Sequence, residues 1–281
     1  MKYVGAHLSI LKGIEKVPEY AKSIGADAFA IFLKNQRSWK LPKIDLKKIE
    51  LFKKNLKKFN FHKRNILPHS IYLINLGSPE KDTRKNSYEA FLFELKQVEN
   101  LELLYLNLHP GSGKGKQSKE KTMEYISNLI NNALKKTKKA IVVLENTSGA
   151  GGQVGSNFEE LFYIYKMIKD KKRIKFCLDT CHLFQSKYDL RSFKNYEKTF
   201  QEFEFFFKKK LIAGLHLNDS KAPFGKKIDR HEHIGKGQIG ILPFKRIMND
   251  ERFEEMPLIL ETPWNGMWVE EIKLLKNFIK K

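Results

Sequence analysis

Short apolar runs alternate with amphipathic stretches along the whole chain, and this alternation constrains the fold more than any other feature of the sequence. The runs are rich in β-branched residues and show little internal alternation, which is typical of parallel strands buried on both faces. They cover residues 3–7, 28–32, 66–69, 103–109, 140–145, 174–179, 211–217 and 258–261.

The stretches between these runs have the periodicity of amphipathic helices. They cover residues 13–24, 45–59, 83–100, 118–136, 157–169, 194–209, 243–249 and 270–279. Asn157, followed by Glu159 and Glu160, fits a helix N-cap with acidic residues in the first turn. Eight strand–helix units without a linker predict an α/β fold, a (β/α)8 TIM barrel, with residues 1–281 in a single domain.

Ionisable side chains stand where the predicted strands end. Seven of the eight runs finish at or beside one of them: His7, His69, His109, Glu145, Asp179, His216 and Glu261. The carboxyl ends of barrel strands form one face, and the active site lies there. Because buried ionisable groups are costly unless they are paired or bind metal, this convergence indicates a metal cluster on that face.

The segment 215–240 begins as an apolar strand and continues as a polar loop rich in His, Asp, Lys and Gly. Asp229 and His231 lie two residues apart, so both side chains could bind one ion in an extended loop. His233 continues the same spacing and is the competing ligand. The lysines of this segment and Arg230 are candidate phosphate partners.

The motif D-T-C-H adds a further ligand pair, Asp179 and His182, at the end of the sixth run. Cys181 could be a soft ligand, but a small buried thiol fits it better, and Cys177 belongs to the core. These two cysteines do not form a disulfide framework. His62 lies on the opposite, stabilising face of the barrel and carries no functional prediction.

The net charge of +21 favours a polyanionic partner such as nucleic acid. Only eight of the 53 basic residues are Arg, and the abundance of Lys, Asn, Ile and Phe is typical of an A+T-rich coding sequence, so charge alone supports DNA binding weakly. No apolar run approaches the ~18 residues of a membrane span, and the first residues lack the apolar core of a signal peptide. A cytoplasmic protein without a membrane partner is expected.

Several loops on the predicted active-site face could contact DNA. Gln36 and Arg37 follow the second run and Tyr72 follows the third, where such side chains can wedge into or stack on bases. Ordinary loop packing explains these residues equally well. Two glycine-rich loops, residues 111–116 and 149–155, match neither a P-loop nor a dinucleotide motif, and we expect their backbone to approach a phosphate chain closely.

Taken together, these motifs resemble the endonuclease IV family of metal-dependent apurinic/apyrimidinic endonucleases. The resemblance extends from V-G-A-H-L-S near the start to L-I-L-E-T near the end, and it includes L-E-N-T, L-D-T-C-H and H-L-N-D-S-K. It implies a barrel with three Zn2+ ions, with Mn2+ possible at some sites. The implied ligands form three sets, of which the first two share Glu145: His69, His109 and Glu145; Glu145, Asp179, His216 and Glu261; and His182, Asp229 and His231.

The resemblance also implies residue roles. Glu145, Asp179 and Glu261 would be catalytic, whereas His233 would either support a metal ligand or be structural. From its place on the rim, and not from the resemblance, His7 is expected to hydrogen-bond a ligand carboxylate. The residues expected to contact DNA are Gln36, Arg37, Tyr72, Lys226 and Arg230.

The implied activity is hydrolysis of the phosphodiester on the 5′ side of an abasic site in double-stranded DNA. It leaves a 3′-hydroxyl and a 5′-deoxyribose phosphate, by water that the metals bring to a pKa of about 7. Removal of 3′-blocking groups, a nucleoid-associated location and a monomeric state are expected as well. A sugar isomerase on a related barrel and a non-catalytic nucleic-acid-binding protein are the alternatives.

The chain departs from the family pattern at several points. Gly113 stands where the family usually has His, and the following residues, 114–121, are rich in Lys. The loop after L-E-N-T has an unusual placement of Gly, and residues 262–268 read T-P-W-N-G-M-W. None of these departures removes a proposed ligand, and they concern the details of DNA contact and the relative activity on different lesions.

Overall fold

Seven parallel strands form one curled sheet in the computed structural model, which describes residues 1–263 and 266–280. The strands are β1 (Tyr3–Leu8), β2 (Ala28–Ile31), β3 (Tyr105–Leu108), β4 (Ile141–Glu145), β5 (Ile174–Asp179), β6 (Ile212–Leu217) and β9 (Pro257–Leu260). Their order is β2-β1-β9-β6-β5-β4-β3, so the last strand pairs with the first. Trp264 and Asn265, in the atypical segment after Glu261, lie outside the described residues.

Residues 66–69 correct the prediction of eight regular strands. They bridge the gap between β2 and β3 by isolated parallel bridges, in which His69 pairs with both neighbours and Ile66 with β2 alone. Pro68 accepts a hydrogen bond of 2.7 Å from Asn107 N–H but has no N–H of its own to donate. The barrel therefore closes through an irregular segment, and His69 still reaches the predicted rim.

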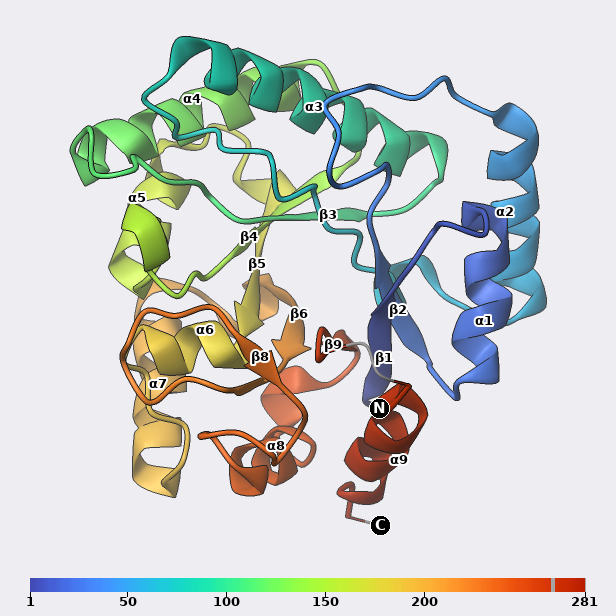
Figure 1. Ribbon diagram of the computed structural model, residues 1–281, viewed down its shortest axis with the longest axis vertical. Helices are drawn as coiled ribbons and strands as arrows, with labels where there is room; N and C mark the ends of the chain where they lie inside the picture. The colour runs from blue at the N-terminus through green and yellow to red at the C-terminus, as the bar shows by residue number, and fades with distance from the viewer. Residues whose placement is uncertain (264–265, 281) are drawn as a thin grey trace.

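Helices lie around the outside of the sheet (Figure 1). They are α1 (Val17–Ser23), α2 (Leu46–Lys58), α3 (Lys81–Asn100), α4 (Lys119–Lys135), α5 (Phe158–Met167), α7 (Phe193–Phe206), α8 (Ile241–Ile247) and α9 (Trp268–Asn277). Each predicted helical stretch overlaps one of these helices. Asn157 is confirmed as the N-cap of α5, because its side chain accepts a hydrogen bond of 2.8 Å from the N–H of Glu160.

Two short elements near the rim were not predicted. Helix α6 (Thr180–Gln185) follows β5 directly, and β7 (Asp219–Ser220) pairs antiparallel with β8 (His231–Glu232). Both are too short to show a hydrophobic period, yet they position His182 and His231.

The core has two parts. A small cluster fills the barrel interior, including Val143, Cys177 and Ile259, and the larger cluster lies between the strands and the surrounding helices. Cys177 and Cys181 are free and buried, as expected. Among the described residues, no helix is long and apolar enough to cross a membrane.

Candidate metal centre

The polar residues at the strand ends converge on one face of the barrel. Glu145 ends β4 and Asp179 ends β5, and the parallel register places Asp179 beside His216 of β6. Glu145, Asp179 and His216 are each fully buried. The sheet thus gathers into one volume three side chains that are far apart in sequence.

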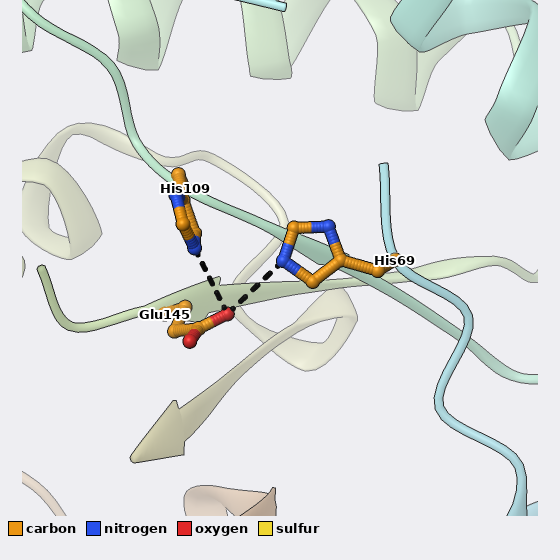
Figure 2. Close-up of side chains that lie close together, drawn as sticks. All are labelled: His69, His109 and Glu145. Carbon is orange, nitrogen blue, oxygen red and sulfur yellow. Dashed lines mark ion pairs between the residues drawn. The ribbon is translucent and has the colours of Figure 1, made fainter. Parts of the chain in front are cut away.

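His69, His109 and Glu145 form the first group (Figure 2). The Nε2 atoms of His69 and His109 lie 3.3 and 3.4 Å from Oε2 of Glu145. On the other side of its ring, His69 Nδ1 donates a hydrogen bond of 2.6 Å to the carbonyl of Ser70. That hydrogen bond leaves Nε2 of His69 directed toward the carboxylate.

Glu145 also belongs to the second group, together with Asp179, His216 and Glu261. His216 Nδ1 lies 3.0 Å from Oε1 of Glu145 and 3.2 Å from Oε2 of Glu261. The two carboxylate oxygens of Glu145 therefore face different groups. A carboxylate in this position can bridge two cations.

The third group consists of His182, Asp229 and His231. The Nε2 atoms of both imidazoles lie 3.2 Å from Asp229, each facing a different carboxylate oxygen. Their Nδ1 atoms donate hydrogen bonds to backbone carbonyls, at 2.9 Å to Asn146 and 3.0 Å to Glu261. All nine sequence-predicted ligands thus fall into the three sets expected.

The donor atoms of these groups fit divalent cations. Nε2 of His69, His182 and His231 is buried without a hydrogen-bond partner, while the opposite nitrogen donates to a carbonyl. An imidazole nitrogen that faces a carboxylate at this distance needs either a proton or a metal cation between the two. Zinc accepts these N and O donors, and the carbonyl contacts are those that orient metal-binding imidazoles.

Opposite charges dominate the electrostatics of the cluster. Burial opposes ionisation of Glu145, but the imidazoles of His216 and His109 hold the pKa of its carboxyl well below the usual value. Burial likewise opposes a charged His182, but Asp179 and Asp229 hold its pKa well above the usual value. Glu145 therefore remains anionic at neutral pH, as cation binding requires.

Buried asparagines orient the carboxylates, and the sequence interpretation did not identify them. Asn218 donates to Asp179, Asn107 donates to Glu145, and the side-chain oxygen of Asn146 accepts a hydrogen bond of 2.7 Å from Asp179 N–H. Asn146 and Asn218 belong to the L-E-N-T and H-L-N-D-S motifs, and this membership is the sequence signal that could have identified them. The residue type alone does not indicate a role in positioning ligands, because the side chains are neutral.

Asp219 organises the loop that carries the third group. Its buried carboxylate accepts backbone hydrogen bonds of 2.7–3.2 Å from Ser220, Gly237, Ile239 and Gly240. A Cβ atom at Gly237 would lie 2.5 Å from Asp219 Oδ1, so that position requires glycine. Both ends of the segment 215–240 are therefore tied to one side chain.

The remaining histidines lie outside the three groups. His7 Nδ1 contacts Oε1 of Glu261 at 2.7 Å, which is the carboxylate contact expected of it. His233 pairs with Glu271 at 3.3 Å, away from Asp229. His62 is an exposed cap whose Nδ1 accepts a hydrogen bond from Arg64 N–H.

An open pocket of about 530 Å³ lies over the groups, and its wall includes Tyr72, Gln153, Lys221 and Arg230. The Tyr72 ring is 59% exposed and packs against His69, with ring centroids 5.5 Å apart. Tyr72 and Arg230 therefore lie where a nucleic acid could contact both them and the metal groups.

The other predicted DNA contacts lie outside the pocket wall. Arg37 and Lys226 are exposed, and Gln36 is partly buried. Arg37 N–H donates to the side chain of Asn35 at 2.9 Å, so a local turn holds that loop. The structure thus does not place Gln36, Arg37 or Lys226 against the metal groups.

The two glycine-rich loops meet beside the pocket. Ser112 forms an isolated antiparallel bridge with Gln153, and its hydroxyl donates to the carbonyl of Gly151 at 2.7 Å. Lys114 and Lys116, in the Lys-rich departure from the family pattern, pair with Glu80 at 3.3 and 3.2 Å. Part of the positive charge of this loop is therefore neutralised within the protein.

A family model described as a xylose isomerase-like TIM barrel matches residues 18–278. The chain is 46% identical over 278 residues to the probable endonuclease 4 of Phocaeicola vulgatus, and the match covers 99% of both proteins. The chain belongs to the endonuclease IV family. A second member, the probable endonuclease 4 of Campylobacter fetus, is 47% identical over 280 residues, which cover 100% of this chain and 99% of the relative.

Solved structures agree with endonuclease IV membership. The crystal structure of endonuclease IV from Thermus thermophilus superposes with a TM-score of 0.86 at 28% identity, over 98% of each chain. The 3-keto-D-glucoside 4-epimerase of E. coli superposes with a TM-score of 0.69 at 13% identity, covering 99% of this chain and 100% of the epimerase. At that identity the likeness shows the barrel fold alone.

Proposed function

We propose that this protein is a DNA-repair endonuclease that hydrolyses the phosphodiester 5′ to abasic sites in double-stranded DNA. The products are a 3′-hydroxyl and a 5′-deoxyribose phosphate, and the same site removes 3′-blocking groups. One observation carries the proposal: three groups of metal-type ligands, two of them joined by Glu145, lie beneath an open pocket bordered by Tyr72 and Arg230. We also propose that residues 1–281 act as one domain and as a monomer.

Three Zn2+ ions are the proposed cofactors, one for each group, and Mn2+ can replace zinc at some of them. Zinc held there supplies Lewis acidity toward phosphate oxygens and generates a nucleophile from water near neutral pH. Glu145 holds two of the sites in a fixed relation, because its oxygens face His69 and His216 separately. No side chain of the protein has to act as a nucleophile.

The carboxylates of this chain supply the negative charge that retains the cations. Glu145, Asp179 and Glu261 are catalytic residues in this proposal, because they would hold the cations of the second group beneath the pocket. Asn218 fixes the orientation of Asp179 by a hydrogen bond of 2.6 Å to Oδ2. Such preorganised charge requires little rearrangement during the reaction.

Residues around the rim recognise the lesion. Tyr72 and Arg37 enter the DNA at the abasic position, Gln36 assists them, and Lys226 and Arg230 contact the phosphate backbone. An abasic nucleotide has no base to unstack, which saves on the order of a few kcal/mol when it leaves the helix. The enzyme can therefore select abasic sites by the ease with which the nucleotide leaves the helix, and it needs no pocket that recognises a base.

The third group favours this reaction over sugar isomerisation. A Glu, Asp, His and Glu site for two metals serves isomerases of the same fold, but His182, Asp229 and His231 provide a further ligand set. A cation held by this set would supply Lewis acidity at the leaving 3′-oxygen of a phosphodiester. A non-catalytic binding protein has no use for nine converging ligands.

The decisive experiment uses a duplex that carries one tetrahydrofuran abasic analogue, incubated with zinc-loaded protein. We expect a single cut on the 5′ side of the analogue, with a 3′-hydroxyl on the released fragment. The analogue cannot undergo β-elimination, so the cut also excludes a Lys Schiff-base lyase. Intact analogue duplex after incubation with fully loaded protein would contradict the proposal.

A further inference from the structure

A buried glutamine at the end of α6 holds the loop that leads to the third ligand group. Gln185 is 0% exposed, and the proposed chemistry does not use it. Its side-chain nitrogen Nε2 carries two N–H bonds, and three oxygens lie around it at 2.8, 2.9 and 3.1 Å: the hydroxyl of Ser220 and the carbonyls of Ala222 and Pro223. One stretch of chain therefore satisfies the donor end of this amide completely.

The acceptor end of Gln185 and the backbone of α6 hold the next residues of the same loop. Four consecutive backbone N–H groups, from residue 225 to residue 228, donate to oxygens of α6 at 3.1–3.3 Å. Those of Lys226 and Ile228 share Oε1 of Gln185, and that of Lys227 donates to the backbone carbonyl of Gln185. One residue therefore contacts the loop from residue 220 to residue 228.

This loop has a backbone conformation that its residue types do not favour by themselves. Lys227 lies in the left-handed region with a φ of 57°, which is uncommon for a residue other than glycine. Gly225 lies in the same region with a φ of 71°. A left-handed lysine persists only where surrounding contacts determine the backbone, and the contacts at residues 226–228 come from Gln185.

We propose that Gln185 is a positioning residue, which fixes Asp229 relative to His182 for binding of the third cation. His182 precedes Gln185 by about one turn of α6, and Asp229 directly follows Ile228, the last residue that Gln185 contacts. The Asp229 side chain is 35% exposed, so packing holds it weakly and its position depends on the backbone that Gln185 holds. The inference rests on the proposed function, which takes His182, Asp229 and His231 as the ligands of a third zinc ion.

Two methionine substitutions separate this role from general stability. Gln185→Met removes the side-chain hydrogen bonds and retains most of the side-chain volume, and it leaves all three ligands of the third group in place. Gln97→Met is the matched control, because Gln97 is also a buried glutamine but lies on α3, which contributes no residue to the three ligand groups. General destabilisation affects both variants, whereas only Gln185→Met releases the loop.

The test combines zinc affinity, measured by competition with a chromophoric chelator, with hydrogen exchange of the metal-free protein, measured by mass spectrometry. For Gln185→Met we expect the zinc equivalent that Asp229→Ala removes to bind about 10- to 100-fold more weakly, while the other two equivalents are unchanged. Peptides that cover residues 220–229 exchange faster, whereas a reference peptide from α4 does not. Incision at limiting zinc falls and recovers as free zinc is raised, because mass action refills the weakened site. Gln97→Met retains the wild-type zinc affinities and exchange.

Two outcomes overturn the inference. One is an unchanged affinity for that zinc equivalent in Gln185→Met, with or without faster exchange; the other is equal weakening of all three equivalents, which marks a general structural role. If Gln185→Met does not fold, Ser220→Ala removes one of the contacts, and the same equivalent must again weaken selectively. Zinc binding and exchange require no DNA. Wild-type protein that binds three equivalents but leaves the tetrahydrofuran duplex intact therefore contradicts the proposed activity and not the positioning role.

Discussion

The side-chain amide of Asn218 donates a hydrogen bond of 2.6 Å to Oδ2 of Asp179. The same side chain accepts a hydrogen bond of 2.9 Å from the N–H of Glu261 through Oδ1. Asn218, which follows β6, thus connects the Asp179 carboxylate at the end of β5 to the backbone of Glu261 just after β9. Because an amide donates and accepts with different atoms, neither Asp nor Leu reproduces both contacts.

Substitution of Asn218 should weaken the cluster without removing a ligand. We expect Asn218→Asp to lower kcat/KM by about 10- to 100-fold, since it replaces a donor to Asp179 with a second carboxylate. Incision kinetics and zinc content measured by mass spectrometry check the effect. Unchanged activity in a fully loaded Asn218→Asp variant would show that Asp179 does not depend on this contact.

Glu145→Ala should abolish incision while largely preserving DNA affinity. The carboxylate faces two ligand groups, so its loss disrupts both, whereas the rim residues remain in place. We expect kcat/KM to fall by at least about 100-fold. Fluorescence anisotropy on the tetrahydrofuran duplex measures affinity, and Glu204→Ala, on the exposed face of α7, is the control. Equal losses of affinity and activity would make Glu145 a structural residue.

Asp229→Ala should remove the third metal selectively. Asp229 contacts His182 and His231, and it is not a member of the first group, which therefore keeps its donors. We expect bound zinc to fall from three equivalents to two, with a large loss of activity. Native mass spectrometry gives the count directly. Retention of three equivalents would place the third ion on other ligands.

Tyr72→Ala should raise KM for lesion-containing DNA and leave the zinc content largely unchanged. Tyr72 is 59% exposed at the mouth of the pocket, and its ring packs edge-to-face against Phe32, with ring centroids 5.1 Å apart. We expect a loss of roughly 1–3 kcal/mol in binding, the range for bases stacked on aromatic side chains. Phe205→Ala, an 83% exposed aromatic residue on α7, should have no such effect.

The stability of the protein should depend on pH through Glu94. Burial raises the pKa of this carboxyl from 4.5 to about 8 in the folded state, so folding favours the protonated form. Its contribution is fully present below the unfolded pKa of 4.5 and is lost as the pH rises toward 8. One proton gives a slope of at most about 1.4 kcal/mol per pH unit.

Urea denaturation from pH 5 to 9 checks this dependence against Glu94→Gln, which cannot titrate. We expect the wild-type protein to lose unfolding free energy relative to the variant across that range. A constant difference between the two proteins at every pH would mean that Glu94 is not protonated in the folded state.

The sequence by itself determined the barrel and the residues of its rim. Parallel strands that are buried on both faces appear in the sequence as recurring apolar runs. Ionisable side chains at the ends of these runs are therefore easy to identify. The family motifs then divided the nine proposed ligands into sets, which the structure places together.

Only the tertiary structure decided how those side chains are held. Pro68 has no N–H to donate, so residues 66–69 form isolated bridges instead of a regular strand. The apolar pattern of this segment does not reveal the missing hydrogen bond. Asn218, Asp219 and Glu94 act through contacts with residues distant in sequence, and no periodic pattern marks their roles. Burial of a strand or helix depends on the spacing of apolar residues, which a single sequence displays. The orientation of a metal-ligand side chain depends on the neighbours that the closed barrel brings into contact with it.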